Sequence, residues 1–162
     1  MVIMPETSGW AGARTPLGPV WVRAGEAGIM AVRLQTPPAP VQEDTAPLAR
    51  RACAAIAAWL QGGEWPRDLP LAPEGTPFQL RVWRVLCEIP PGHTLTYGEL
   101  ARRLETSPRA VGGACRANPV PLLIPCHRVV ARNGLGGFAG RRQGAWPDLK
   151  ARLLAHERKQ PT

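Results

Sequence analysis

The beginning of the chain alternates between hydrophobic and polar residues, a pattern that predicts a small antiparallel sheet. Residues 20–23 and 29–34 are rich in β-branched and other large apolar residues. Residues 24–28 contain two glycines and supply turn chemistry between these runs. We therefore expect an antiparallel element within residues 14–35, followed by a proline-rich loop over residues 35–46.

A helix is predicted next, over residues 48–60. Apolar residues recur there at helical spacing, and the glycines at positions 62 and 63 stop the pattern. Residues 65–75 contain three prolines and are predicted to be a linker. We therefore expect two domains, a small α/β scaffold at residues 1–72 and a second domain at residues 76–162.

Three helix starts in the second domain carry capping residues. Residues 76–79, Thr-Pro-Phe-Gln, place an N-cap, a proline at the first helical position and a capping-box glutamine in order. Residues 96–99, Thr-Tyr-Gly-Glu, form a second capping box, and Ser107 caps a third helix that ends near Ala117. The second and third helices are separated by a short turn, which predicts a helix-turn-helix.

The third of these helices is built from small residues. An ordinary repressor presents long polar side chains at this position to read base edges. This helix instead presents Ala110, Gly112, Gly113 and Ala114, which offer almost no hydrogen-bond code but permit close approach to a sugar-phosphate backbone. We therefore expect sequence-independent binding in the minor groove.

Charge separates the two halves of the chain. The net charge is +8; residues 1–75 hold 6 Lys/Arg and 7 Asp/Glu, whereas residues 76–162 hold 14 and 5, which gives −1 and +9. A GC-rich genome would explain the preference for arginine over lysine, but it does not explain the asymmetry. The second half is therefore expected to bind a polyanion such as nucleic acid.

The cysteines and the hydropathy predict the compartment. Four cysteines occur, at positions 53, 87, 115 and 126, without a C-x-x-C pair, so neither a disulfide framework nor a zinc site is expected. We expect Cys53 and Cys87 to be inert packing residues. No apolar run is long enough to span a bilayer and the start of the chain lacks a secretion signal, so a cytoplasmic location is expected.

Candidate chemistry concentrates in residues 124–130, Ile-Pro-Cys-His-Arg-Val-Val. Cysteine reacts as its thiolate, and the imidazole of His127, directly after Cys126, can take the thiol proton. Pro125 fixes one backbone torsion beside the nucleophile and stiffens the turn. For an arbitrary Cys-His pair, a buried structural cysteine beside a surface histidine would be the simpler interpretation. The flanking residues argue against it here.

Those flanking residues carry a resemblance to a known family. Asn118-Pro119, the Pro-Cys-His-Arg-Val run and residues 136–140, Gly-Gly-Phe-Ala-Gly, closely resemble the O6-alkylguanine-DNA alkyltransferases, also called methylated-DNA–protein-cysteine methyltransferases. The resemblance runs from residue 76 to residue 157 and is fainter before it. It implies a small ribonuclease-H-like α/β domain and a mostly α, winged-helix-like domain with the helix-turn-helix. It also implies a monomer without cofactor. Some members of the family carry an N-terminal structural zinc, but residues 1–75 hold one cysteine and no histidine, so no metal is expected here.

The resemblance further implies the reaction and its catalytic residues. Cys126 takes the alkyl group from O6-alkylguanine in duplex DNA, irreversibly and once per molecule. His127 acts as general base through a water, Glu157 orients His127, and Asn118 locks the turn that carries the cysteine.

Residues for DNA contact and for the substrate pocket follow from the same resemblance. Arg109 intercalates where the flipped base was, and Tyr97 acts at the neighbouring phosphate and donates to guanine N3. The carbonyls of Cys126 and Val129 accept from the exocyclic amine. The expected pocket residues are Tyr97, Cys115, Val129, Phe138, Ala139 and Gly140.

This sequence departs from the family pattern after the cysteine. The loop that follows Cys126 is slightly shorter than usual, and Phe138 stands where tyrosine is common. Arg141 replaces a second glycine, and residues 141–146 include an insertion. These departures bear on the size of the alkyl group that is accepted, not on the class of reaction.

Three competing interpretations remain. A lesion-binding relative without catalysis would carry another residue, usually tryptophan, in place of Cys126. A helix-turn-helix regulator would not need Cys126-His127 beside the DNA-facing helix. A cysteine hydrolase would need an oxyanion hole and open access for water.

Overall fold

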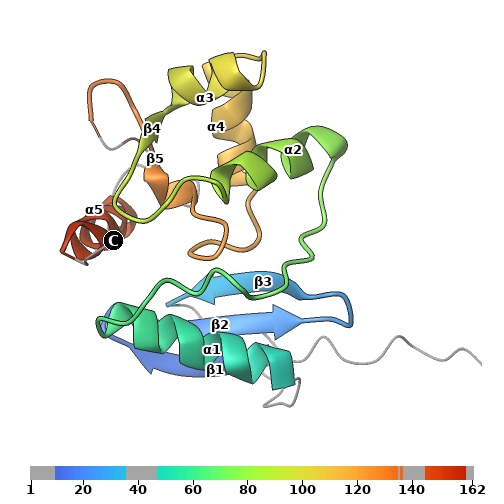
Figure 1. The fold of residues 1–162 in the computed structure, drawn as a ribbon, viewed down its shortest axis with the longest axis vertical. Coiled ribbons are helices and arrows are strands. Elements are labelled where there is room, and N and C mark those ends of the chain that lie inside the picture. The colour runs from blue at the N-terminus through green and yellow to red at the C-terminus, as the bar shows by residue number, and fades with distance from the viewer. Residues whose placement is uncertain (1–9, 36–46, 135, 137–144, 160–162) are drawn as a thin grey trace, which may run out of the picture. The chain divides into compact units, whose positions relative to one another are not determined.

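The computed structural model describes residues 10–35, 47–134, 136 and 145–159. The chain divides into two compact units, Met1–Glu74 and Gly75–Thr162, here called unit 1 and unit 2 (Figure 1). No helix in the described part of the chain is both long enough and apolar enough to cross a membrane.

Unit 1 contains a three-stranded antiparallel sheet in the order β1-β2-β3. The strands are β1 (Trp10–Thr15), β2 (Gly18–Ala24) and β3 (Ile29–Leu34). The alternating pattern predicted β2 and β3. It did not predict β1, because the sequence Trp-Ala-Gly-Ala-Arg-Thr is mostly small residues, which have low strand propensity.

One face of this sheet is covered by a helix. α1 (Pro47–Leu60) packs against β1 and β2 (Figure 1). The inward residue Val22 pairs with Ala11 on one side and with Val32 on the other, and all three are buried. Leu48, at the start of the helical pattern, is only half-buried. The buried residues of α1 are Ala49, Ala52, Cys53, Ile56, Trp59 and Leu60.

Part of the predicted linker belongs to the structure of unit 1. The backbone N–H of Ile29 donates to the carbonyl of Pro70 at 2.8 Å, and the N–H of Ala72 donates to the carbonyl of Ile29 at 2.8 Å. Trp65 is buried. The prolines of this segment therefore shape an extended stretch that runs beside β3 rather than a free connection.

Unit 2 is built mainly of helices. They are α2 (Pro77–Leu86), α3 (Tyr97–Arg103), α4 (Pro108–Arg116) and α5 (Ala145–Arg158). A single turn of 3₁₀ helix, η1 (Cys126–Arg128), leads directly into β5 (Val129–Val130), which pairs in parallel with β4 (Leu95–Thr96).

Both predicted capping boxes are present. The Thr76 hydroxyl accepts from the N–H of Gln79 at 3.1 Å, and the Gln79 side chain accepts from the N–H of Thr76 at 2.9 Å. Thr96 and Glu99 make the same pair of bonds at the start of α3, and Ser107 caps α4. α3 and α4 pack against each other as the predicted helix-turn-helix pair.

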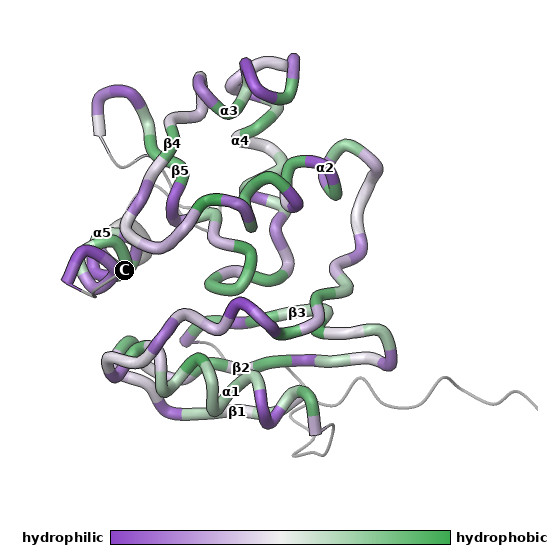
Figure 2. The backbone as a smooth tube through the Cα atoms, in the orientation of Figure 1, coloured by the Kyte–Doolittle hydropathy of each residue, from purple (hydrophilic) through white to green (hydrophobic). Residues whose placement is uncertain are grey.

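The core of unit 2 lies between α2, α4 and the segment that precedes η1. Val82 and Leu86 of α2 are buried, whereas Phe78 in its first turn is only half-buried. Trp83 is also buried, and its indole N–H donates to the carbonyl of Ala114 at 2.8 Å. Residues 120–124 form a hydrophobic segment (green in Figure 2) that is buried except for Pro121, and this segment anchors the turn that carries the cysteine.

Candidate active site

The cysteine of the sequence motif lies in a tight and buried turn. The Cys126 N–H donates to the carbonyl of Ile124 at 2.7 Å, and the Arg128 N–H donates to the carbonyl of Pro125 at 3.0 Å. Cys126 is 6% exposed, and His127 and Arg128 are fully buried. The thiol therefore sits on a backbone segment that local hydrogen bonds hold in place.

Asn118 ties together the segment that leads to the cysteine. Its side-chain amide donates to the carbonyl of Ile124 at 2.9 Å, and its side-chain carbonyl accepts from the N–H of Val120 at 2.9 Å. Because both ends of the amide are used, an apolar replacement would leave buried backbone groups without these bonds.

Glu157 on α5 joins two consecutive residues of the turn. One carboxylate oxygen lies 2.9 Å from His127 Nε2, and the Arg128 Nε lies 3.1 Å from each oxygen. A terminal nitrogen of Arg128 also donates to Glu157, and the other donates to the carbonyl of Ile89 at 2.6 Å. Burial would raise the pKa of Glu157, but the bonds from His127 and Arg128 outweigh it and lower the pKa to about 2.

The carboxylate of Glu157 determines which nitrogen of His127 can act as a base. Burial lowers the pKa of His127, although Glu157 opposes the shift, so the ring is neutral at pH 7. An ionised carboxylate only accepts hydrogen bonds, so the neutral ring carries its proton on Nε2. The lone pair is therefore on Nδ1, and this is the atom that can receive a proton.

The thiol of Cys126 is protonated at rest. Burial raises its pKa, while a hydrogen bond with the Asn118 side chain and the charge of Lys150 act in the opposite direction. Burial also raises the pKa of the neighbouring Cys115 to about 12, with the proximity of Cys126 adding to the shift. The site therefore needs a proton acceptor at the moment of reaction rather than a standing thiolate.

Lys150 is a site residue that the sequence did not point to. It is fully buried on α5, and its ammonium donates to the carbonyl of Val129 at 2.7 Å and lies 5.8 Å from the centre of the Tyr97 ring. Burial lowers its pKa to about 8, although Cys126 and Cys115 oppose the shift. The available signal was helical spacing, because Lys150 precedes Glu157 by seven residues on one buried face of α5.

Arg128 is a second residue without an assigned role in the sequence motif. The run Pro-Cys-His-Arg-Val marks it as part of the resemblance, yet only the fold shows that it clamps Glu157. Its burial is tolerable because the carboxylate of Glu157 and the carbonyl of Ile89 accept its hydrogen bonds.

Tyr97 stands at the edge of the same cluster, as the first residue of α3. Gly136 packs against it, so that a Cβ added to Gly136 would lie 3.1 Å from the Tyr97 ring. Gly136 also has a φ of +74°, which favours glycine. The other pocket residues expected in this loop, Phe138, Ala139 and Gly140, lie outside the described residues.

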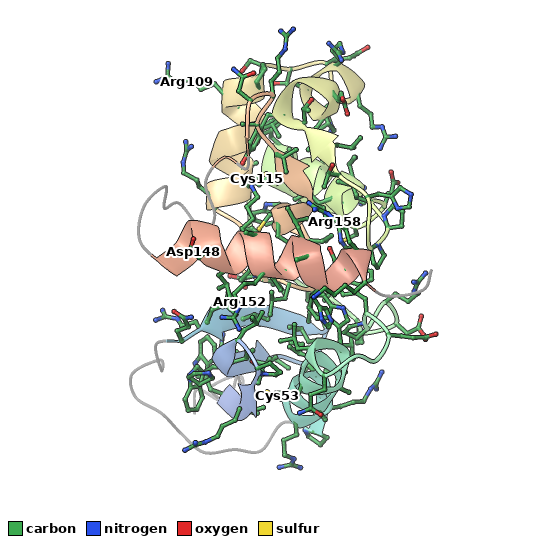
Figure 3. All side chains as sticks on the ribbon, turned by 90° about the vertical axis from the view of Figure 1, so that its left-hand side faces the viewer. Cys53, Arg109, Cys115, Asp148, Arg152 and Arg158 are labelled. Atoms are coloured by element: carbon green, nitrogen blue, oxygen red, sulfur yellow. The ribbon has the colours of Figure 1, made fainter. Side chains whose placement is uncertain are left out.

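α4 presents one face outward and one inward. Arg109 is exposed near its start and points away from the body of unit 2, whereas Cys115 lies inside (Figure 3). Gly112 and Gly113 are half-exposed on the outer face, and Ala110 is half-exposed near the start of the helix. The expectation for Ala114 was wrong: it is 3% exposed, because residues 111, 114 and 115 share the face that packs on the core.

The side chains brought together here suit one kind of chemistry. A buried thiol is next to a neutral histidine, whose orientation is set by an ionised carboxylate, and a buried cation lies close by. This is the arrangement of an activated cysteine nucleophile. Among the described residues, no three His, Cys, Asp or Glu side chains gather in a way that could hold a metal ion.

Comparison with known proteins gives a consistent result. Residues 77–159 match the family model described as "6-O-methylguanine DNA methyltransferase, DNA binding domain". A methylated-DNA–protein-cysteine methyltransferase of Methanosarcina acetivorans is 38% identical over 135 residues, which cover 77% of this chain and 85% of that protein. A DNA base-flipping protein of Thermus thermophilus is 42% identical over 147 residues, covering 88% and 95%.

Other relatives match over less of their length or by fold. A methylated-DNA–protein-cysteine methyltransferase of Methanosarcina mazei is 53% identical over 75 residues, and this match spans about half of that protein (48%) and 44% of this chain. The crystal structure of the O6-methylguanine methyltransferase of Mycobacterium tuberculosis superposes with a TM-score of 0.81 at 28% identity, covering 95% of this chain and 94% of that chain. On these grounds the chain belongs to the O6-methylguanine-DNA methyltransferase family.

Proposed function

We propose that this protein repairs DNA by transferring the alkyl group of O6-alkylguanine to its own Cys126, once and irreversibly. The observation that carries the proposal is the buried turn in which Cys126 precedes His127, with His127 bound to the ionised Glu157. The turn belongs to the same unit as the helix-turn-helix pair α3 and α4. A reactive residue and a DNA-docking element are thus carried by one compact body.

The transfer is an in-line displacement at the alkyl carbon. The sulfur of Cys126 forms the new C–S bond, the bond between the alkyl carbon and guanine O6 breaks, and its electron pair stays on the guanine. A proton then restores neutral guanine. The product is a thioether, which has no easily ionised leaving group, so the protein is consumed and no cofactor is needed.

Removal of the thiol proton depends on three residues, His127, Glu157 and Arg128. The thiol proton leaves through a water to Nδ1 of His127, and Glu157 stabilises the imidazolium that forms. Arg128 keeps Glu157 ionised and fixes its orientation. Glu157 therefore works as a positioning residue and not as an acid, since its pKa of about 2 keeps it ionised at physiological pH.

Lys150 acts as a second positioning residue. Its ammonium holds the carbonyl of Val129, which is one of the two carbonyls expected to accept from the guanine amine. A carbonyl oxygen has two lone pairs, so it can serve Lys150 and a base together. The same charge favours the thiolate of Cys126 during the transfer.

DNA engagement rests on the outer face of α4. Arg109 fills the space of the flipped base, and Gly112 and Gly113 let the helix approach the backbone of the minor groove without reading sequence. Tyr97 contacts the phosphate beside the target nucleotide and donates to guanine N3. A strong consensus among sequences selected from random DNA would contradict this mode of binding.

Finer features of the fold and setting belong to the same proposal. Unit 1 is a ribonuclease-H-like scaffold, and unit 2 is a winged-helix-like domain that binds DNA and carries out the reaction. The protein works as a monomer in the cytoplasm, a compartment that suits its four free cysteines.

A second candidate function is lesion binding by base flipping without chemistry. It is favoured by the relative in Thermus thermophilus that is named a DNA base-flipping protein. In that case the protein would hold the flipped base and leave it unaltered. Cys126 and its proton acceptor His127 would then have no use.

The mass of the intact protein separates the two functions. After mixing with duplex DNA that contains O6-methylguanine, transfer adds about 14 Da to each molecule, because one hydrogen is replaced by a methyl group. Peptide mapping should place the addition on Cys126. An unchanged mass combined with tight, lesion-dependent binding would support lesion binding alone and overturn the transfer reaction.

A further inference from the structure

The sheet of unit 1 has a second face, opposite α1. Strand register places Trp10 against Arg23, Gly12 against Trp21, and Trp21 against Arg33. Opposed residues share a face, and alternate residues of each strand return to it. We call this the outer face of the sheet. Its members, all exposed or half-exposed, are Trp10, Gly12, Arg14, Pro19, Trp21, Arg23, Ala31 and Arg33.

This outer face is positively charged although unit 1 as a whole is not. Its only ionisable members are Arg14, Arg23 and Arg33. The acidic residue nearest in sequence among the described residues is Glu26, which lies in the turn between β2 and β3. The charge of −1 over residues 1–75 therefore conceals a local cluster of three arginines.

The Trp21 ring lies against the sheet because the residue opposite it on β1, Gly12, has no side chain. A Cβ built on Gly12 would lie 2.4 Å from Cζ3 and 2.5 Å from Cε3 of the Trp21 ring. The ring therefore rests directly on the backbone of β1, and only glycine permits this contact. The side chain is half-exposed, so the ring covers the strand while presenting surface to solvent.

The Trp10 ring lies beside two of the arginines. The guanidinium carbons of Arg23 and Arg33 each lie 5.8 Å from the centre of the Trp10 ring, within the range of cation–π contact. Arg33 is exposed, so its N–H groups can donate to phosphate oxygens, whereas Arg23 is half-exposed and its Nε is buried. The arginines are thus held in place before any partner arrives.

We propose that the outer face of the sheet binds single-stranded nucleic acid. Sites of this kind combine a basic surface with aromatic rings on which unstacked bases lie. The Trp10 row and the Trp21 row are two residues apart along the strands, about 7 Å, so a base stacked on the Trp21 ring lies beside the arginines grouped around Trp10. Duplex DNA keeps its bases stacked inside, and an acidic peptide would use the arginines but not the flat rings.

The proposal is independent of alkyl transfer, because the outer face belongs to unit 1 and Cys126 to unit 2. The probe is a single strand of thymidines and 5-iododeoxyuridines without alkylated bases, irradiated in complex with the full-length protein. We expect cross-links to peptides that contain Trp10 or Trp21. The reaction of the same preparations with free O6-benzylguanine reports separately on the transfer site.

Charge-reversal variants connect the cross-links to the outer face. Arg14→Glu combined with Arg33→Glu changes two exposed side chains and should lower the yield of these cross-links by at least tenfold. The matched control is Arg50→Glu with Arg51→Glu, which reverses two exposed arginines on α1 and should leave the yield unchanged. Trp21→Ala should weaken the same contact by roughly 5- to 150-fold.

Three results would overturn the proposal. Cross-links confined to unit 2 would mean that single strands bind only at the transfer unit. Equal yields in the two charge-reversal variants would mean that the arginines of the outer face play no part. Displacement of the strand by polyglutamate as effectively as by unlabelled oligonucleotide would mean that the face binds acidic polypeptides by charge alone.

Discussion

Replacing Lys150 by methionine tests whether its buried ammonium serves the reaction or the fold. Lys150 lies with its side chain fully buried and with its charge beside the Cys126 turn. Methionine has similar length and fills the same space without charge. If Lys150 serves the fold, its replacement should mainly lower the free energy of unfolding. If it serves the reaction, its replacement should mainly lower the rate of alkyl transfer.

The pKa of Lys150 sets the expected change in stability. Lowering it from 10.5 to about 8 means that burial of the charged form disfavours the folded protein by about 3 kcal/mol. Methionine removes this cost but leaves the carbonyl of Val129 without its donor, which costs about 1–3 kcal/mol. The variant should therefore unfold in urea within about 2 kcal/mol of the wild type at pH 7.

The dependence of stability on pH gives a second and more specific signal. Between about pH 8 and pH 10.5 the unfolded chain keeps the proton of Lys150 while the folded chain has lost it. The unfolded state binds more protons there, so the contribution of Lys150 to stability rises with pH. The unfolded chains of both proteins carry the same thiols, so the difference between wild type and Lys150→Met should isolate the rise that comes from Lys150 and its interaction with Cys126 and Cys115.

The Lys150→Met substitution should slow alkyl transfer even though it changes stability little. Loss of a charged hydrogen bond worth about 1.5–3 kcal/mol in the transition state slows the reaction roughly 10- to 150-fold. The rate is measured with free O6-benzylguanine, so that DNA binding does not enter. Wild-type activity should also fall above about pH 8 as Lys150 loses its charge, whereas the low rate of the variant should lack this decline.

Lys159→Met is the matched control, because Lys159 is exposed just beyond α5 and should change neither quantity. The reasoning would be refuted if Lys150→Met lost more than about 3 kcal/mol of stability while the folded fraction reacted at the wild-type rate. The role of Lys150 would then be to stabilise β5 and not to assist the reaction.

Three further results are expected. Cys126→Ala should abolish transfer, measured by intact mass, yet bind duplex DNA within a few-fold of wild type, because phosphate contacts supply most of the affinity; alkylation of another cysteine in this variant would contradict the assignment. Arg109→Ala should slow repair of duplex DNA roughly 10- to 150-fold while sparing free O6-benzylguanine, since an intercalated side chain offsets the cost of flipping; Arg84→Ala, another exposed arginine, should have no such effect, and equal slowing on both substrates would exclude the finger role. Glu157→Gln should lower the free energy of unfolding by about 3–5 kcal/mol, because it leaves the buried Arg128 without its counter-ion, and the double variant with Arg128→Met should recover part of the loss in a urea denaturation cycle; additive losses would show that the two residues do not act as a pair.

The helix starts of unit 2 were accessible from sequence because capping is local. A threonine and a residue three positions later complete the same pair of hydrogen bonds wherever the chain later folds. The catalytic turn was accessible for a different reason. Its short run of residues resembles a known family closely enough to predict the nucleophile, Cys126.

Contacts between distant segments were not accessible in the same way. From the sequence, Lys150 is interpreted as a solvated lysine in a terminal helix. In the folded protein, α5 packs against the turn and brings Lys150 to the carbonyl of Val129. From the sequence, Ala114 is interpreted as part of the DNA-facing surface. In the folded protein, Trp83, which is remote in sequence, donates to the carbonyl of Ala114 from inside the core. The spacing of residues along one helix says which of them share a face, not which face is covered.

The sequence by itself determined the reaction class and the positions of most helices, and it predicted the nucleophile, because these depend on residue types at short range. Only the tertiary structure decided the protonation states of the site, since burial and the contacts of Glu157 with His127 and Arg128 arise when α5 meets η1. It also decided the outer face of the sheet. β1 has a weak pattern of its own, and only pairing with β2 sets Trp10 and Gly12 beside Arg23 and Trp21. Energies that depend on desolvation and on strand register exist only once the chain has folded.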